Sequence, residues 1–600
     1  MSQAAVPRQP PGQSAQPTGD RAPVDPSLSE ASRLLCVGAY VHHVFRRKVV
    51  EELYVHEERF AAPSYGIDAV RVLAHALRAR RIEISWAVGL LSLWVLATKL
   101  SSFLFLLLLA PCLLLALASF VRGTDKQTNG PRRALALVLR WLGRAVLALL
   151  LLAFLARALV GRASYEEDEA RGGPLGVLQS LLGTVFPDGL DGAFGGVGPE
   201  VAWLTLGAFV LSTAAVGAQH AQLSKILTEE LSARTFGDRR NDPAENSAGL
   251  RFVRLSERIA VEQRSPLIRY GAAVPFRGAG VPFQTWELAI ELKARDDVPQ
   301  VPIDNRIILE RIRPLVLALR KPSAQDAPER SWAVRDRLRE LVVDECVFLP
   351  VVGLGARAHA QYGEGHFQRH LACAVEEGGE TRRHFLRIRV GGWNEEIVVT
   401  VFVRVHTQGG MLMLEIAPHL LPRVLPAFED EVREAHRFLR NSWFGKVAWA
   451  LAHTPAVPVR SLVAVSGGLY GTWQVLAGGH RRALPEGPEM SVREFGSDNG
   501  LSVFQSMDAD RYLKSIQDRV AGGVRAALYE AGWQTGEFEQ KVFHIGNGGV
   551  LIGSVHHSAV GVGTGASAAT SNTGTLPGAP QTGTRTQKGR SRGGNSHDRS

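Results

Sequence analysis

Cysteine is scarce in this chain of 600 residues, which contains only four: Cys36, Cys112, Cys346 and Cys373. No two of them lie close enough in the sequence to form a CxxC motif. This spacing excludes a zinc ribbon and a fold built on disulfides. A low cysteine content without pairs is typical of a protein in a reducing compartment.

The chain also lacks the short motifs that mark the common enzyme classes. It contains no GxSxG, no Walker A sequence, no HExxH and no kinase signature set. A GxGxxA stretch at Gly353, Gly355 and Ala358 has the spacing of a dinucleotide-binding loop, but Gly363 and Gly365 would break the helix that such a site needs. We therefore interpret the stretch as a loop, expect no cofactor and favour a binding role. An enzyme whose catalytic groups meet only in the folded protein stays an alternative.

Histidines and acidic residues offer few candidates for a site. His366 and His370 are four residues apart, a spacing that brings two metal ligands together on a helix. Both fall in a run that we interpret as a strand, where residues four apart stand too far from each other for one ion. Glu395, Glu396 and His406 flank the ends of another β run, where charges are usually solvated. We expect no metal site and no catalytic acid–base pair among these residues.

Lysine is rare as well, since arginine outnumbers it 58 to 10 in a chain of formal net charge +10. Positive charge suits nucleic acid or an anionic membrane surface. However, the sequence contains no stripe of basic residues interleaved with aromatic ones, and basic residues are expected at the cytoplasmic ends of membrane spans. The composition therefore argues against nucleic-acid binding.

Apolar residues make up 46% of the chain and concentrate between positions 84 and 220. This pattern predicts a transmembrane domain over 82–220, with four spans at 84–98, 103–121, 141–160 and 201–218. One helix from 84 to 121 would be about 57 Å long, which exceeds a hydrocarbon core of about 30 Å. The first two spans therefore form a hairpin that turns at 99–102. We expect Arg140 and Arg144 to reach the membrane surface rather than to line an ion path.

Basic and acidic residues are distributed unevenly around these spans. Arg78, Arg80 and Arg81 precede the first span and basic loops follow the second and the fourth, whereas the loop after the third span carries the acidic stretch 165–170. The positive-inside rule then places both termini in the cytoplasm and the protein in the cytoplasmic (inner) membrane. The segment 174–186 is apolar but short, and the sequence leaves open whether it crosses the membrane or lies at its surface.

The remaining sequence predicts cytoplasmic segments on both sides of the spans. Residues 1–30 are rich in Pro, Gln and Ser and predict a disordered arm, and 31–81 predict cytoplasmic helices. The region 250–541 predicts a cytoplasmic α+β domain, with a strand at 285–294 and helices at 303–320, 329–345, 427–440 and 508–533. Four β runs separated by glycine-bearing turns predict an antiparallel β-meander at 366–376, 384–390, 395–406 and 411–417.

The segment 542–563 is β-prone and uncharged apart from its histidines, so that copies of it could stack in register between chains. Its core resembles the RHIM-like amyloid signalling motifs, whose pattern is Val/Ile, Gln, Val/Ile, Gly, although Leu551 stands where the usual glutamine would. The resemblance implies self-association through Val550, Leu551, Ile552, Gly553 and Val555. A disordered tail is expected over 564–600.

These features predict an integral membrane protein that acts by binding and assembly, in the manner of a signalling protein. Its expected partners are the lipid bilayer, other copies of the chain and a protein that the sequence does not identify. The layout resembles bacterial multi-pass membrane proteins, a resemblance that implies no activity. Two alternatives are a pore-forming effector triggered through the C-terminal motif and a membrane-bound enzyme.

Overall fold

The computed structural model describes residues 25–122, 130–163, 198–246, 249–320, 338, 340–376, 379–392, 396–477, 480, 483–498 and 500–546. The chain divides into two compact units, residues 1–539 and 540–600. The elements below belong to the first unit, except for the end of the last helix. The stretch 165–170 and the segment 174–186 lie outside the described residues.

A bundle of short helices precedes the apolar helices: η1 (Pro26–Leu28), α1 (Glu30–Val41), α2 (His43–Val50) and η2 (Glu51–Val55). Ser29 caps α1, because its hydroxyl accepts a hydrogen bond from the Ser32 N–H at 3.1 Å. Leu35 and Phe45 are fully buried in a core that also contains Phe428 of α13 (Pro426–Arg440). The N-terminal helices and a helix from late in the chain therefore share one core.

Four helices are long and apolar enough to cross a membrane, as the sequence predicts. They are α3 (Ala69–Leu100), η3 with α4 (Leu104–Leu108 and Leu109–Arg122), α5 (Gly130–Ala163) and α8 with η4 (Pro199–Lys225 and Ile226–Glu230). Between α3 and η3 the chain reverses at Ser102 and Phe103, whose φ angles are 50° and 68°. The first two apolar helices thus form a hairpin. Since α3 begins at Ala69, the last of the expected cytoplasmic helices and the first span are one continuous helix.

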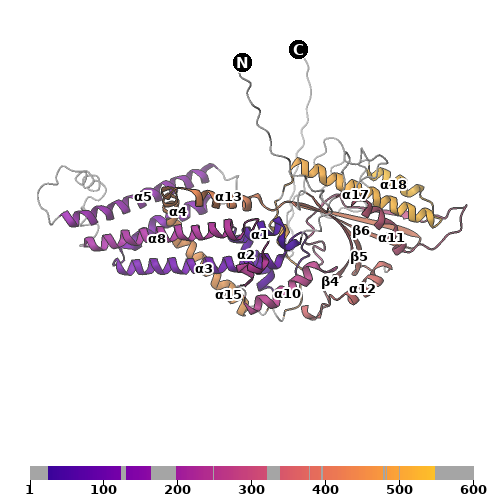
Figure 1. The fold of residues 1–600 in the computed structure, drawn as a ribbon, viewed down its shortest axis with the longest axis horizontal. Coiled ribbons are helices and arrows are strands. Elements are labelled where there is room, and N and C mark those ends of the chain that lie inside the picture. Colours follow the sequence, from indigo (N-terminus) through magenta and orange to yellow (C-terminus); the bar gives the residue numbers. More distant parts are fainter. Residues whose placement is uncertain are drawn as a thin grey trace, which may run out of the picture. The chain divides into compact units, whose positions relative to one another are not determined.

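A seven-stranded sheet follows the apolar helices in the sequence. Its strands are β1 (Leu267–Tyr270), β2 (Val281–Pro282), β3 (Trp286–Glu291), β4 (Leu341–Pro350), β5 (Arg383–Gly392), β6 (Ile397–Gln408) and β7 (Met411–Leu421). Strands β4 to β7 pair antiparallel in chain order, but β1 pairs parallel with β4, and both β2 and β3 pair with β7. The sheet is therefore mixed and curves as a half-barrel (Figure 1), which corrects the prediction of a plain antiparallel meander.

Both faces of this sheet are covered, which explains the nearly unbroken burial of β6. Side chains alternate between the two faces of a strand. On one face Phe402 packs in an aromatic cluster, with its ring centroid 4.7 Å from that of Phe276 and 5.7 Å from that of Phe348. On the other face the Thr407 hydroxyl donates to Asn305 Oδ1 at 3.0 Å. Asn305 begins α11 (Asn305–Leu317), which packs on this face together with α17 (Val503–Glu530).

Helix α17 continues through Gly522 and Gly523, a pair that weakens a helix on propensity alone. A side chain at position 523 would come within 2.7 Å of the Ile312 Cα atom in α11. The glycine therefore allows the two helices to pack closely on the sheet (Figure 1).

Two predictions for this domain are wrong. Residues 366–376 belong to α12 (Glu364–Glu376) and not to a strand, because Phe367, Leu371 and Val375 recur at helical spacing and face β4 and β5. Residues 341–345, predicted to end a helix, instead begin β4, where consecutive β-branched residues favour a strand. The earlier part of that predicted helix falls mostly outside the described residues.

A helical hairpin that the sequence did not lead us to expect follows α13. It consists of α14 (Trp443–His453), η8 (Thr454–Ala456) and α15 (Val457–Ala477). The hairpin packs against α3, α4 and α8. Its large apolar side chains stay more than 60% exposed at Trp443, Phe444, Leu469, Trp473 and Leu476. An apolar surface of this kind, next to helices that can cross a membrane, is typical of a segment in contact with lipid.

Candidate functional site: an arginine-lined cavity

A cavity of about 1220 Å³ lies between α4, α5 and the α14–α15 hairpin. Its walls are mostly apolar, but its lining includes five arginines, Arg122, Arg133, Arg140, Arg144 and Arg460. Among the described residues that line the cavity, none is an aspartate or a glutamate. The cavity therefore combines apolar walls with an excess of positive charge.

The arginines come from three elements that meet at the cavity. Arg133, Arg140 and Arg144 are spaced by seven and four residues along α5, which places them on one side of the helix. Arg122 is the last residue of α4, and Arg460 lies in the first turn of α15. The sequence pattern of α5 thus creates a basic stripe, and the packing of the hairpin turns that stripe into one wall of a cavity.

The contacts of α15 with α3 indicate how deep the cavity lies. Near the middle of α15, the Arg80 guanidinium of α3 donates to the Gly468 carbonyl at 2.9 Å. At the beginning of α15, Val457 is buried against Leu90 of α3. Leu90 lies about 15 Å further along α3 than Arg80, at ~1.5 Å per residue. If α3 crosses a membrane, the tip of the hairpin lies about halfway into a hydrocarbon core of ~30 Å.

This arrangement suits a particular class of ligand. Guanidinium groups bind phosphate and carboxylate through paired, charge-assisted hydrogen bonds. Arginine at membrane depth is costly unless it meets an anion or water. The Arg144 guanidinium lies 5.8 Å from the ring centroid of Trp141, which stabilises its charge only in part. The cavity can therefore accommodate a molecule with an anionic head and an apolar body.

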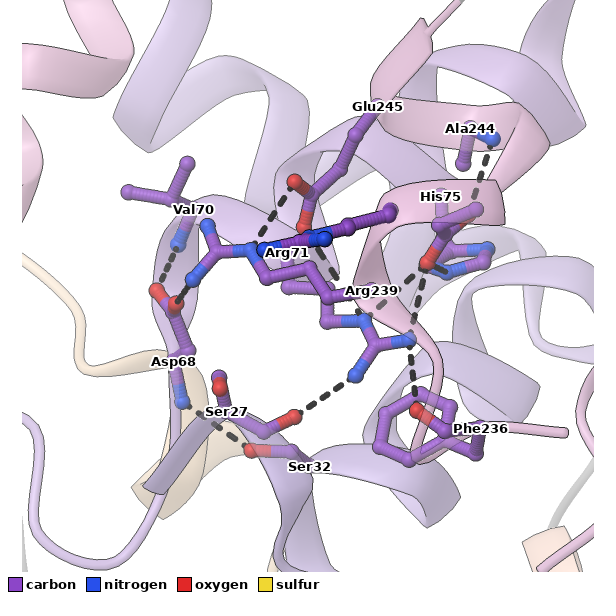
Figure 2. Close-up of polar contacts among 12 residues, drawn as sticks. Ser27, Ser32, Asp68, Val70, Arg71, His75, Phe236, Arg239, Ala244 and Glu245 are labelled. Carbon is purple, nitrogen blue, oxygen red and sulfur yellow. Dashed lines mark hydrogen bonds and ion pairs between the residues drawn. The ribbon is translucent and has the colours of Figure 1, made fainter. Parts of the chain in front are cut away.

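A second cluster lies at the base of α3, where the arginine Arg71 meets carboxylates and carbonyl groups of the chain (Figure 2). The Arg71 side chain is buried, and its guanidinium donates to Asp242 Oδ2 at 3.0 Å from two nitrogens. It also donates to the Ser27 carbonyl at 2.8 Å and to the Phe236 carbonyl at 2.9 Å. These contacts join the start of the first apolar helix to the chain that follows the last one.

Asp242 remains ionised in this cluster because its neighbours outweigh its burial. Burial alone would raise the pKa of the Asp242 carboxyl, but His75, the Ala244 N–H and Arg71 hold that pKa well below its usual range. The His75 Nε2 atom lies 3.1 Å from Asp242 Oδ2, and the Ala244 N–H donates to Oδ1 at 2.9 Å. The charged groups of Arg71 and Asp242 are both hydrogen-bonded to other parts of the chain, so we interpret the cluster as a structural clasp.

The two histidines singled out in the sequence do share a helix face, contrary to the prediction of a strand. His366 and His370 are four residues apart on α12. Burial lowers the pKa of His370, and nearby arginines lower it further. Among the described residues, no third potential ligand completes a metal group with this pair.

The other residues considered for chemistry do not meet in one site. Glu396 accepts a hydrogen bond from Gln505 at 3.1 Å, and His406 contacts a neighbouring glutamine side chain at 3.2 Å. Glu395 lies outside the described residues. The GxGxxA stretch at 353–358 lies in the connection between β4 and α12, as a loop should.

Most of the segment predicted to self-associate, 542–563, lies outside the described residues. The predicted segment begins at 542, and residues 542–546 form the end of α18 (Gly536–Gly546). The proposed contact residues lie outside the described residues: Val550, Leu551, Ile552, Gly553 and Val555.

A family model described as an AbeC-like domain matches residues 285–557. The match begins at β3 and includes β4 to β7, α13, the α14–α15 hairpin and α17. It leaves out β1 and β2, although both pair with strands of the same sheet. No curated protein and no solved structure matches the chain. The hairpin wall of the cavity thus lies within the residues that the family model matches, whereas α4 and α5, which supply the other walls, precede them.

Proposed function

We propose that the protein is a membrane-anchored binding and assembly protein whose arginine-lined cavity binds an anionic phospholipid. One observation carries the proposal: Arg140, Arg144 and Arg460 line an otherwise mostly apolar cavity whose described lining contains no carboxylate. A phosphodiester head supplies the missing charge, and acyl chains match the apolar walls. A cavity of about 1220 Å³ exceeds what a phosphate ion needs, which favours a lipid over the free anion.

The hairpin connects this cavity to the sheet domain. Strand β7 leads into α13, and α13 leads directly into α14, which ends at the cavity wall. In our proposal a lipid in the cavity favours the position in which the hairpin forms the cavity wall. The sheet domain responds because α13 connects it directly to the hairpin. A ligand shifts such an equilibrium only as far as it prefers one state over the other.

We assign assembly to the C-terminal segment, with Ile552 at its core. Anchoring in a membrane confines copies of the chain to two dimensions and so raises their effective concentration. Ile552→Asp would introduce like charges about 4.8 Å apart in a stack. The purified full chain should form large oligomers that Ile552→Asp abolishes. Equal oligomers in both proteins would remove the segment from the proposal.

The orientation belongs to the same proposal: both termini lie in the cytoplasm, with the hairpin entering the membrane from that side. The basic residues at the ends of α4 and α5, including Arg122 and Arg133, support it. Topology reporters fused at Gly172 and at Gly249 should report opposite sides of the membrane. Reporters on the same side would exclude the four-span arrangement.

Lipid binding is tested with the full chain, purified in detergent and examined by native mass spectrometry with added phosphatidylglycerol or phosphatidylcholine. We expect phosphatidylglycerol to be retained at least tenfold more tightly. In Arg140→Gln/Arg144→Gln this preference should fall at least tenfold, because the loss of one charge-assisted hydrogen bond of roughly 1.5 kcal/mol already corresponds to about that factor. The matched control is Arg433→Gln/Arg437→Gln, two exposed arginines with the same spacing on α13.

Two results would contradict the proposal. One is equal retention of the two lipids by the unmodified chain. The other is the same loss in the α13 control as in the cavity variant. Competition by millimolar inorganic phosphate would show that the cavity takes the free anion and not the lipid.

A further inference from the structure

Two histidines and a glutamate from distant parts of the chain meet beside the N-terminal helices. His56 and Glu58 follow η2, and His480 follows α15. The Nδ1 atom of His56 lies 2.7 Å from Glu58 Oε1, and the Nδ1 atom of His480 lies 3.2 Å from the same oxygen. The ligand atoms of the three side chains all lie within 4.8 Å of one another.

The backbone fixes this meeting. The Phe60 N–H donates to the Glu486 carbonyl at 3.0 Å, and the Glu486 N–H donates to the Glu58 carbonyl at 3.1 Å. These bonds form a short parallel bridge between the two segments that carry the side chains. These main-chain contacts hold the segment of Glu58 beside Glu486, six residues after His480, and do not depend on the three side chains.

The glutamate is not satisfied by its two histidines. Glu58 is only 6% exposed, and its Oε2 atom is buried without a hydrogen-bond partner among the described residues. A buried carboxylate oxygen without a partner is costly. A bound cation would give this carboxylate the partner that its Oε2 atom lacks among the described residues.

We propose that His56, Glu58 and His480 bind a zinc ion. Two imidazole nitrogens and one carboxylate are a ligand set that Zn²⁺ prefers, and they leave a fourth position for water. Ligands about 2.0–2.2 Å from a tetrahedral zinc lie roughly 3.3 Å apart. The observed separations of 2.7 and 3.2 Å are close to this value, so small side-chain shifts admit the ion.

The position of the site suggests what the ion does. His480 follows the end of α15, the helix that leaves the cavity, whereas His56 and Glu58 belong to the segment between η2 and α3. The ion therefore pins the exit of the hairpin to the N-terminal helices. This role is independent of any ligand in the cavity.

The test uses the full chain in detergent, with any affinity tag removed and metals stripped by a chelator. After Zn²⁺ is added and the protein is desalted, elemental analysis should find one zinc per chain, and zinc should raise the melting temperature. His480→Ala and Glu58→Gln should each weaken zinc binding at least ~tenfold and remove the thermal shift. The matched control is His366→Ala/His370→Ala, a helical histidine pair without a third ligand, which should bind zinc like the unmodified chain.

Zinc-free samples separate a lost site from a lost fold. His480→Ala should melt at the same temperature as the unmodified chain when both lack zinc. If the unmodified chain retains no zinc, or if His480→Ala and Glu58→Gln retain it equally well, the three residues are only a hydrogen-bonded cluster. If zinc binding is lost in His366→Ala/His370→Ala instead, the zinc site lies on α12 and not at His480.

Discussion

The arginines at the base of α3 and those of the cavity differ in what they face. Arg71 is enclosed by protein acceptors, and its closest carboxylate, Asp242, is itself held by His75 and a backbone N–H. Arg140 and Arg144 face a cavity whose described lining contains no carboxylate. Both groups lie on long helices of the same chain, so the difference comes from their partners and not from the residue type.

This difference separates a structural role from a binding role. A buried ion pair that is completed within the chain resists change, because removing one partner leaves the other as an uncompensated charge. Arg140 and Arg144 lie close to other arginines and to no carboxylate among the described lining residues, so a bound anion would relieve their mutual repulsion. The first arrangement uses its charges to hold the fold together, and the second keeps them available for a ligand.

Arg71→Met should have the largest effect on stability. It would leave Asp242 ionised and buried, and we expect a loss of about 3–5 kcal/mol in the free energy of unfolding. Denaturant titration of the detergent-solubilised chain, followed by tryptophan fluorescence, measures this loss. Arg71→Met/Asp242→Leu removes both charges and should recover part of it.

The control for this prediction is Arg433→Met on α13. Arg433 pairs with Glu429 and Asp430, but all three side chains are more than half exposed. Exposed pairs contribute only about 0–1 kcal/mol. If Arg71→Met costs no more than Arg433→Met, the cluster at the base of α3 is not a clasp.

His419 shows a third way to bury an ionisable group, which is to keep it neutral. It lies in β7 among aromatic rings, and burial lowers its pKa to about 4. Its pKa in the unfolded chain is about 6.5, so the unfolded state binds the proton first as the pH falls. The free energy of unfolding is therefore not reduced by His419 above pH ~6.5. Between pH ~6.5 and 4 it falls progressively, by about 3 kcal/mol in all, because the unfolded state gains the proton first.

Unfolding measured between pH 7.5 and 4 tests this dependence. His419→Gln should lose about 3 kcal/mol less over this range than the unmodified chain does. His436→Gln, which removes an exposed histidine on α13, should leave the pH dependence unchanged. If the free energy of unfolding changes with pH in the same way in His419→Gln and in the unmodified chain, the buried histidine does not control this pH dependence.

The apolar helices were predictable from the sequence because their signal is local. An apolar run of sufficient length identifies a span whatever its neighbours are. The run over 341–350 also has a local signal, its β-branched residues, but the preceding residues drew the prediction towards a helix. The error at 366–376 arose because the helical spacing of Phe367 and Leu371 was given less weight than the glycines around the segment.

The cavity could be predicted only in part. The one-sided spacing of Arg140 and Arg144 is visible in the sequence, but their shared wall depends on the α14–α15 hairpin, which is distant in the chain. A signal for that hairpin was present: 443–477 is almost uncharged, rich in aromatic residues and interrupted near its centre by Pro455 and Pro458. The zinc ligands give no such signal, since only the fold brings His480 to His56.

The smallest effect on stability should come from giving the cavity the carboxylate that it lacks. Ala148 lines the cavity one helical turn after Arg144, so Ala148→Glu places an acid beside the guanidinium. An exposed pair of this spacing changes the free energy of unfolding by no more than about 0.5 kcal/mol. Phosphatidylglycerol binding should nevertheless fall about tenfold, because the new carboxylate competes with the phosphate for the same arginine, whereas the isosteric Ala148→Gln should bind nearly as well as the unmodified chain. Native mass spectrometry of the unmodified chain and the two variants measures whether the charge or the size of the new side chain weakens lipid binding. Equal losses of phosphatidylglycerol binding in Ala148→Glu and Ala148→Gln would mean that the cavity selects its ligand by volume. The contrast with the Arg71 cluster would then no longer explain lipid binding.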